Sequence, residues 1–108
     1  MIVKKKTKPR KAAKRPAPRP KDWREAIRVY LAKAPWVDAV FAATENDTIH
    51  VYSVVKELRE KYYEGLHEQE NRIEKAFPEI SFEFHTWVHQ GREPSKSGPV
   101  FTELVYLR

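Results

Sequence analysis

The chain has 108 residues, enough for one domain, and carries a net charge of +6. It has no cysteine, which excludes a disulfide framework, a cysteine-based zinc site and thiol catalysis. The charge is unevenly distributed. Residues 1–21, the tail, carry ten basic side chains and no acidic ones, so residues 22–108, the body, hold 11 basic and 15 acidic side chains, a net charge of −4.

The tail has the composition of a disordered segment. Four of the eight prolines lie within it, interleaved with Lys and Arg, and it has few apolar side chains to bury. We therefore expect residues 1–21 to be disordered. Only three apolar residues precede Lys4, so we expect no secretory leader, and the longest apolar run, Ala39 to Ala43, is too short to cross a bilayer. We expect a soluble cytoplasmic protein with no membrane partner, located at the nucleoid or in the nucleus if the tail binds DNA.

The uncompensated positive charge of the tail predicts binding to nucleic acid or another polyanion, without sequence specificity. Two alternatives remain: the tail lies on its own acidic body, or it has no partner. The residues predicted to contact phosphates are Lys4, Lys5, Lys6, Lys8, Arg10, Lys11, Lys14, Arg15, Arg19 and Lys21.

The body begins with a predicted helix. Asp22 stands at an N-cap position with Glu25 three residues later, which resembles a capping box. Apolar residues then recur at helical spacing from Trp23 to Ala34, and Pro35 ends the pattern.

A hairpin and a second helix follow. Residues 37–43 and 48–55 are rich in β-branched and aromatic side chains and are separated by the turn formers of residues 44–47, which predicts two antiparallel strands. Residues 57–77 show a helical stripe that ends before Pro78. Gly65 within this helix costs roughly 1 kcal/mol relative to Ala unless close packing requires it.

Residues 80–89 alternate strictly, with Phe82 and Phe84 on one face and Glu83 and His85 on the other. A loop over residues 91–99 and a last strand over residues 100–107 complete the chain. The order α-β-β-α-β-β predicts an α+β two-layer sandwich, with a mostly antiparallel four-stranded sheet and both helices on one face. We expect residues 22–108 to form a single domain, preceded by the disordered basic tail.

Several function classes are excluded by their missing motifs. The three glycines, at positions 65, 91 and 98, cannot form a P-loop or a dinucleotide-binding loop. The G-x-x-G loop of a KH domain is absent, and Phe82-Glu83-Phe84 is only a fragment of an RRM core motif. We therefore predict no cofactor and no catalytic residues, and lean against an enzyme.

The polar face of the strand at 80–89 is the candidate partner surface, because it presents an indole opposite the face that the helices cover. Glu83 and His85 lie about 7 Å apart, close enough to chelate a metal if His50 approaches from a neighbouring strand. Nothing in the sequence fixes that approach, so no metal site is predicted. The predicted surface consists of Glu83, His85, Trp87 and His89.

Glu70 falls on the inward stripe of the second helix, where a carboxylate must be hydrogen-bonded or have a raised pKa. Alternatively the helix rotates slightly, Gln69 takes the inner position and Glu70 reaches solvent, and this second arrangement is the one we expect.

The composition favours a non-catalytic binding protein, whose tail contacts nucleic acid and whose body provides a surface for a protein partner or a second copy. The alternatives are a small enzyme that uses Glu83, His85 and His50, and a regulatory, antitoxin-like partner of another protein.

Overall fold

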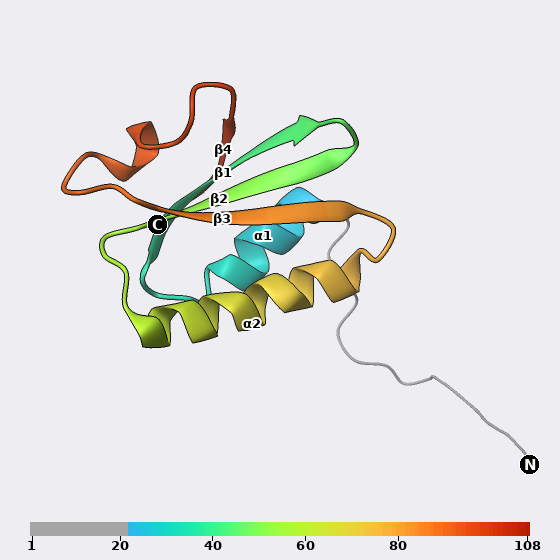
Figure 1. Ribbon diagram of the computed structural model, residues 1–108, viewed down its shortest axis with the longest axis horizontal. Coiled ribbons are helices and arrows are strands. Elements are labelled where there is room, and N and C mark those ends of the chain that lie inside the picture. The colour runs from blue at the N-terminus through green and yellow to red at the C-terminus, as the bar shows by residue number, and fades with distance from the viewer. Residues whose placement is uncertain (1–21) are drawn as a thin grey trace, which may run out of the picture.

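The computed structural model describes residues 22–108, and the tail lies outside the described residues, as do the predictions that concern it. The elements follow the order α1 (Trp23–Leu31), β1 (Val37–Glu45), β2 (Thr48–Val55), α2 (Glu60–Ala76), β3 (Ser81–Val88), the short 3₁₀ helix η1 (Pro94–Lys96) and β4 (Glu103–Leu107). Both α-helices cover one face of a four-stranded sheet, and the loop that contains η1 lies toward the other face (Figure 1). The α+β class is therefore confirmed.

The sheet is mixed, which corrects the expectation of a mostly antiparallel one. Its strand order is β3-β2-β1-β4, and β1 pairs antiparallel with both β2 and β4, whereas β2 and β3 are parallel. The physical reason is the connection. A two-residue turn reverses the chain between β1 and β2, so these strands are antiparallel. After β2, the connection through α2 returns the chain to the end of the sheet where β2 begins, so β3 runs in the same direction as β2.

Local signals account for α1 and for the hairpin. The Asp22 carboxylate accepts a hydrogen bond of 2.8 Å from the backbone N–H of Glu25, as the capping pattern predicts. The hairpin turn places Asn46 and Asp47 at φ values of 52° and 65°, the left-handed region that these two residue types tolerate best among non-glycine residues. The start of α1 and the hairpin turn are thus encoded locally, whereas α2 begins after Arg59 without a side-chain cap.

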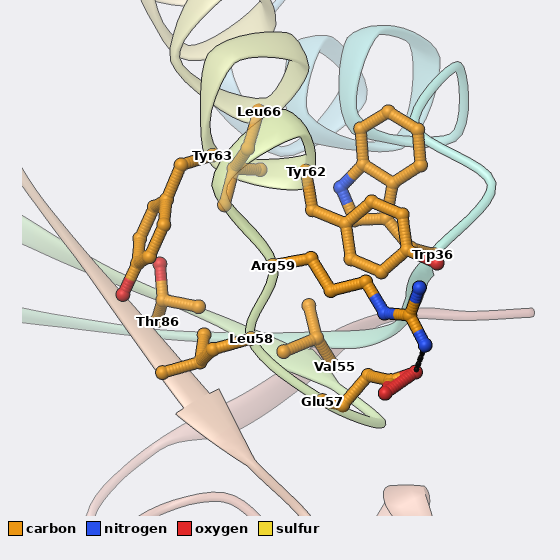
Figure 2. Close-up of a pocket in the computed structure, with 9 residues that line it drawn as sticks. All are labelled: Trp36, Val55, Glu57, Leu58, Arg59, Tyr62, Tyr63, Leu66 and Thr86. Carbon is orange, nitrogen blue, oxygen red and sulfur yellow. Dashed lines mark ion pairs between the residues drawn. The ribbon is translucent and has the colours of Figure 1, made fainter.

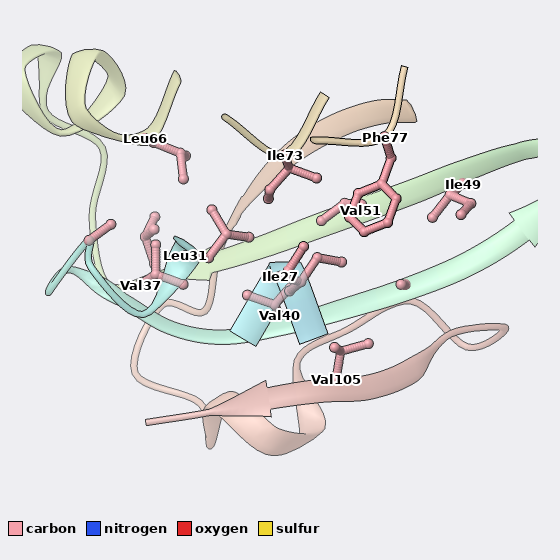
Figure 3. Packing of buried hydrophobic residues seen from close by; sticks show 14 residues of the cluster. Ile27, Leu31, Val37, Val40, Ile49, Val51, Leu66, Ile73, Phe77 and Val105 are labelled. Carbon is pink, nitrogen blue, oxygen red and sulfur yellow. The ribbon is translucent and has the colours of Figure 1, made fainter. Parts of the chain in front are cut away.

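The core fills the space between the two helices and the sheet. Leu66 and Ile73 of α2 and Ile27 of α1 point toward Val40 and Val51 of the sheet, and all five are buried (Figure 3). On edge strand β3, Phe82 and Phe84 pack against this core and are half-buried, because no further strand covers their outer side.

The last strand is shorter than predicted. It begins at Glu103 rather than near residue 100, and Val100 and Phe101 are about 90 % exposed. At its end, Arg108 donates hydrogen bonds of 2.8–3.0 Å to the carbonyl oxygens of Ala32, Ala34 and Val37, which ties the chain end to the turn after α1. None of the helices within residues 22–108 is long and apolar enough to cross a membrane.

Candidate functional site

The sheet face opposite the helices, here called the open face, carries the candidate site. In the parallel ladder between β2 and β3, His50 stands opposite Glu83 and Tyr52 stands opposite His85. Because alternate residues share a face, Glu83, His85 and Trp87 lie together on the open face, beside His50 and Tyr52. The alternation predicted for β3 agrees with this placement.

A row of rings runs along β2 and β3 on the open face, alternating between the two strands. The His85 imidazole stacks on the Tyr52 ring, with centroids 4.6 Å apart and planes 14° apart, and on the His50 imidazole at 5.6 Å. The Trp87 indole meets Tyr52 edge-on at 5.6 Å and is 41 % exposed. The row therefore holds its rings in fixed orientations and presents the indole to solvent.

Three polar atoms converge within this row. Oε1 of Glu83 lies 2.9 Å from Nδ1 of His50 and 3.3 Å from Nε2 of His85, and these two nitrogens are 3.4 Å apart. The side chain of Glu83 is 58 % exposed, whereas those of His50 and His85 are 19 % and 33 % exposed. The parallel register has thus brought together the three residues whose proximity the sequence left open, and a metal ion is one group that they could hold.

His89 is not exposed as the predicted partner surface required, which corrects that prediction. The strand ends at Val88, and Gln90 and Gly91 turn the chain with φ values of 54° and 82°. His89 is buried, and its Nε2 lies 3.0 Å from Oδ2 of Asp38. Its role is structural, because the polar atoms of its ring are directed into the protein.

A pocket of about 240 Å³ borders the row at the hairpin end of the sheet. His50, Tyr52 and Glu45 form one side of it, and Phe101 and Thr102 come from the loop before β4. Phe101 is 90 % exposed, so within residues 22–108 no other side chain covers this ring at the rim of the pocket. The sequence pointed to neither Tyr52 nor Phe101, because their juxtaposition depends on where the loop folds back.

A second crevice lies between α2 and the segment after β2 (Figure 2). Tyr62 stacks on Trp36 with centroids 4.9 Å apart, and Arg59 lies over Tyr62 while pairing with Glu57 at 3.1 Å. The volume that remains is about 10 Å³, near the lower limit for one water molecule. This crevice is packing rather than a ligand site.

Glu70 is buried, which corrects the expectation that it reaches solvent. Its Oε1 lies 3.0 Å from Nδ1 of His67, and Gln69 is buried beside it. Burial raises the pKa of the Glu70 carboxyl, and the hydrogen bond and the charge of His67 oppose that rise. Polar side chains, those of Gln69 and Glu70, therefore occupy two buried positions of α2.

Comparison of the chain with protein-family models, with curated proteins and with solved structures found no match. The function is therefore inferred from the charge distribution and from the geometry of the open face.

Proposed function

We propose that this protein is a non-catalytic nucleic-acid-binding protein whose tail contacts phosphates and whose open face binds unpaired bases. The observation that carries the proposal is the separation of charge, with ten cations and no anions in residues 1–21 and a net charge of −4 in residues 22–108. Phosphate contacts by Lys and Arg supply most of the affinity of non-specific nucleic-acid binding. The tail's contribution is therefore affinity without sequence preference.

The open face is suited to bases rather than to phosphates. Glu45 and Glu83 lie on or beside it and repel a phosphate backbone, but the exposed Trp87 indole offers an aromatic surface. Phe101 adds a second exposed ring at the rim of the pocket. Stacking of bases on aromatic side chains contributes about 1–3 kcal/mol per base and tolerates any sequence. Single-stranded nucleic acid is thus favoured over a duplex. We propose a cytoplasmic location if the ligand is RNA, and a location at the nucleoid or in the nucleus if it is DNA.

Fluorescence anisotropy of labelled single strands and duplexes across a salt series tests the phosphate contacts of the tail and the preference for single strands, with chelator present throughout. About five phosphate contacts give a slope of log K against log salt of roughly −3 to −4 on a single strand and −4 to −5 on a duplex. We expect residues 22–108 alone to bind far more weakly than the full chain. Equal binding by both chains, or a slope near zero, would rule out the role of the tail.

Two substitutions test the open face. Trp87→Ala and Phe101→Ala should each weaken single-strand binding about fivefold or more and leave duplex binding nearly unchanged. Val29→Ala is the matched control, since Val29 is an exposed apolar side chain on α1, on the other side of the sheet. Unchanged single-strand affinity in both aromatic variants would contradict base stacking on the open face.

A protein partner or a second copy on the open face is tested in the same samples. The exposed Trp87 indole is the apolar side chain that such a partner would cover, and it lies on the eight-residue edge strand β3. Sedimentation at increasing concentration reports a dimer directly, and a dimer abolished by Trp87→Ala would assign the open face to self-association instead.

A small enzyme is the second candidate function, and the convergence of His50, Glu83 and His85 is the observation that favours it. General acid–base work needs titratable groups within hydrogen-bond reach of a substrate, as these are of one another. Turnover of a nucleotide or ester substrate that is lost in Glu83→Gln or His85→Ala would replace the binding proposal.

A further inference from the structure

The open face holds three potential metal-ligand atoms at the separations that a metal ion imposes. Zn²⁺ binds imidazole nitrogen and carboxylate oxygen at about 2.0–2.2 Å, so donors lie about 3.3–3.6 Å apart in a tetrahedral site and about 2.8–3.1 Å apart in an octahedral one. The separations among Nδ1 of His50, Oε1 of Glu83 and Nε2 of His85 are 2.9, 3.3 and 3.4 Å. One ion can therefore contact all three atoms with only small side-chain movements.

Hydrogen bonding alone does not satisfy this arrangement. Each imidazole nitrogen carries at most one proton, and an ionised carboxylate carries none. If both nitrogens are protonated, both donate to Glu83 but two N–H groups face each other at 3.4 Å. If only one is protonated, the bare nitrogen of the other faces the carboxylate oxygen. At most two of the three contacts are favourable, whereas a cation at their centre makes all three favourable.

The surroundings hold the ligands in place. The Tyr52 ring stacks on His85 and fixes the orientation of its imidazole. On the far side of His50, Nε2 lies 3.7 Å from Oε1 of Glu45, so a proton on Nε2 faces a carboxylate. Metal-bound histidines commonly direct their other N–H to a carboxylate, which leaves the ligating nitrogen unprotonated. The 3.7 Å separation exceeds hydrogen-bond length, so the Glu45 carboxylate favours a proton on Nε2 of His50 only through its charge, and Nδ1 then has its lone pair available for the ion.

We propose that His50, Glu83 and His85 form a binding site for Zn²⁺ or another divalent first-row transition metal. Two imidazoles and one carboxylate suit these ions better than Mg²⁺ or Ca²⁺, which prefer oxygen ligands. Three protein ligands on a partly exposed face leave a coordination position open to solvent. His50 also lines the pocket of about 240 Å³, so a molecule in that pocket lies next to the metal. The site shares the open face with the proposed base-binding rings, but it rests on His50, Glu83 and His85 alone and does not depend on nucleic-acid binding.

The test is titration of the full chain, freed of metal, with Zn²⁺ against a chromophoric indicator, and with Co²⁺ followed by visible absorption. We expect one ion per chain. Glu83→Gln, which is nearly isosteric and exposed, should weaken Zn²⁺ binding about tenfold or more, and His50→Ala and His85→Ala should weaken it further. Zn²⁺ should also raise the Tm of the unaltered chain and not that of the His50→Ala, His85→Ala double variant.

His67→Gln is the matched control. His67 also lies 3.0 Å from a glutamate oxygen, that of Glu70, but this pair offers two donors rather than three. We expect the His67→Gln variant to bind Zn²⁺ with the same affinity as the unaltered chain. All four histidines lie in the part of the chain that the structure describes. Absence of binding, binding that survives Glu83→Gln and His85→Ala, or an equal loss in His67→Gln would overturn the proposal.

Discussion

Oδ2 of Asp38 lies 3.0 Å from Nε2 of His89, so the irregular start of β1 is bonded to the residue just after β3, across the end of β2. The backbone N–H of Gly91 donates to the other ring nitrogen, Nδ1, at 3.2 Å. Nδ1 is therefore the acceptor, and Nε2 carries the proton that it donates to Asp38. One neutral tautomer of His89 satisfies both contacts and fixes the start of the loop that covers part of the open face.

Asp38→Ala should lower the free energy of unfolding by about 1–3 kcal/mol, because it leaves the buried Nε2–H of His89 without its acceptor. Urea unfolding followed by tryptophan fluorescence measures the change. Asp38→Asn keeps an acceptor oxygen in place and should recover most of the loss. If the two variants are equally destabilised, the charge of Asp38 rather than its hydrogen bond to His89 stabilises the fold.

Gly65→Ala should destabilise the protein, the reverse of its effect in an open helix. A Cβ at Gly65 would lie 2.7 Å from two ring atoms of Trp36, and that ring is held by stacking on Tyr62. The gain of roughly 1 kcal/mol in helix propensity is then outweighed by about 1–3 kcal/mol of overpacking. In a Trp36→Leu background, the same change should become neutral or stabilising. Equilibrium unfolding of the unaltered chain, the two single variants and the double variant measures the change in the free energy of unfolding in each background. Stabilisation by Gly65→Ala with Trp36 present would contradict the packing.

Gly98→Ala should loosen the loop over the open face. Its Cβ would overlap the ring of Phe41, a buried side chain on β1, so the loop or the ring must move, at a cost of about 1–3 kcal/mol. Phe41→Ala should remove most of that cost, which a double-mutant cycle measures as coupling. Gly91→Ala is the contrast: it has open space but a φ of 82°, so its cost should not depend on Phe41.

Glu70→Gln should stabilise the protein at neutral pH. Burial raises the pKa of Glu70 above its unfolded value, so the folded state binds more protons than the unfolded state between the two values. Stability of the unaltered chain therefore falls as pH rises from about 4.3, the ordinary pKa of Glu, through the raised folded pKa. Glu70→Gln removes this penalty, so its advantage in Tm should be present at pH 7 and vanish near pH 4. An advantage that does not change with pH would contradict the burial argument.

Most secondary structure was predictable because its signals are local. The Asp22 cap, the Asn46–Asp47 turn and the breaks at Pro35 and Pro78 act within a few residues of their own positions. The alternation of β3 likewise assigned Glu83 and His85 to the face opposite Phe84, and the sheet keeps that assignment. Periodicity alone determines which side chains share a face of an element.

What only the tertiary structure decided is which elements are neighbours. The parallel pairing of β2 with β3 sets His50 opposite Glu83, and no local feature of either strand specifies that partner or that register. The burial of His89 and Glu70 was decided in the same way, by the approach of Asp38 and by the core around α2. The sequence by itself determined the helices, the turns and the faces of the strands, since these follow from short-range geometry. The candidate metal ligands meet only because long-range packing selects one strand order and one register among several that the same pattern allows.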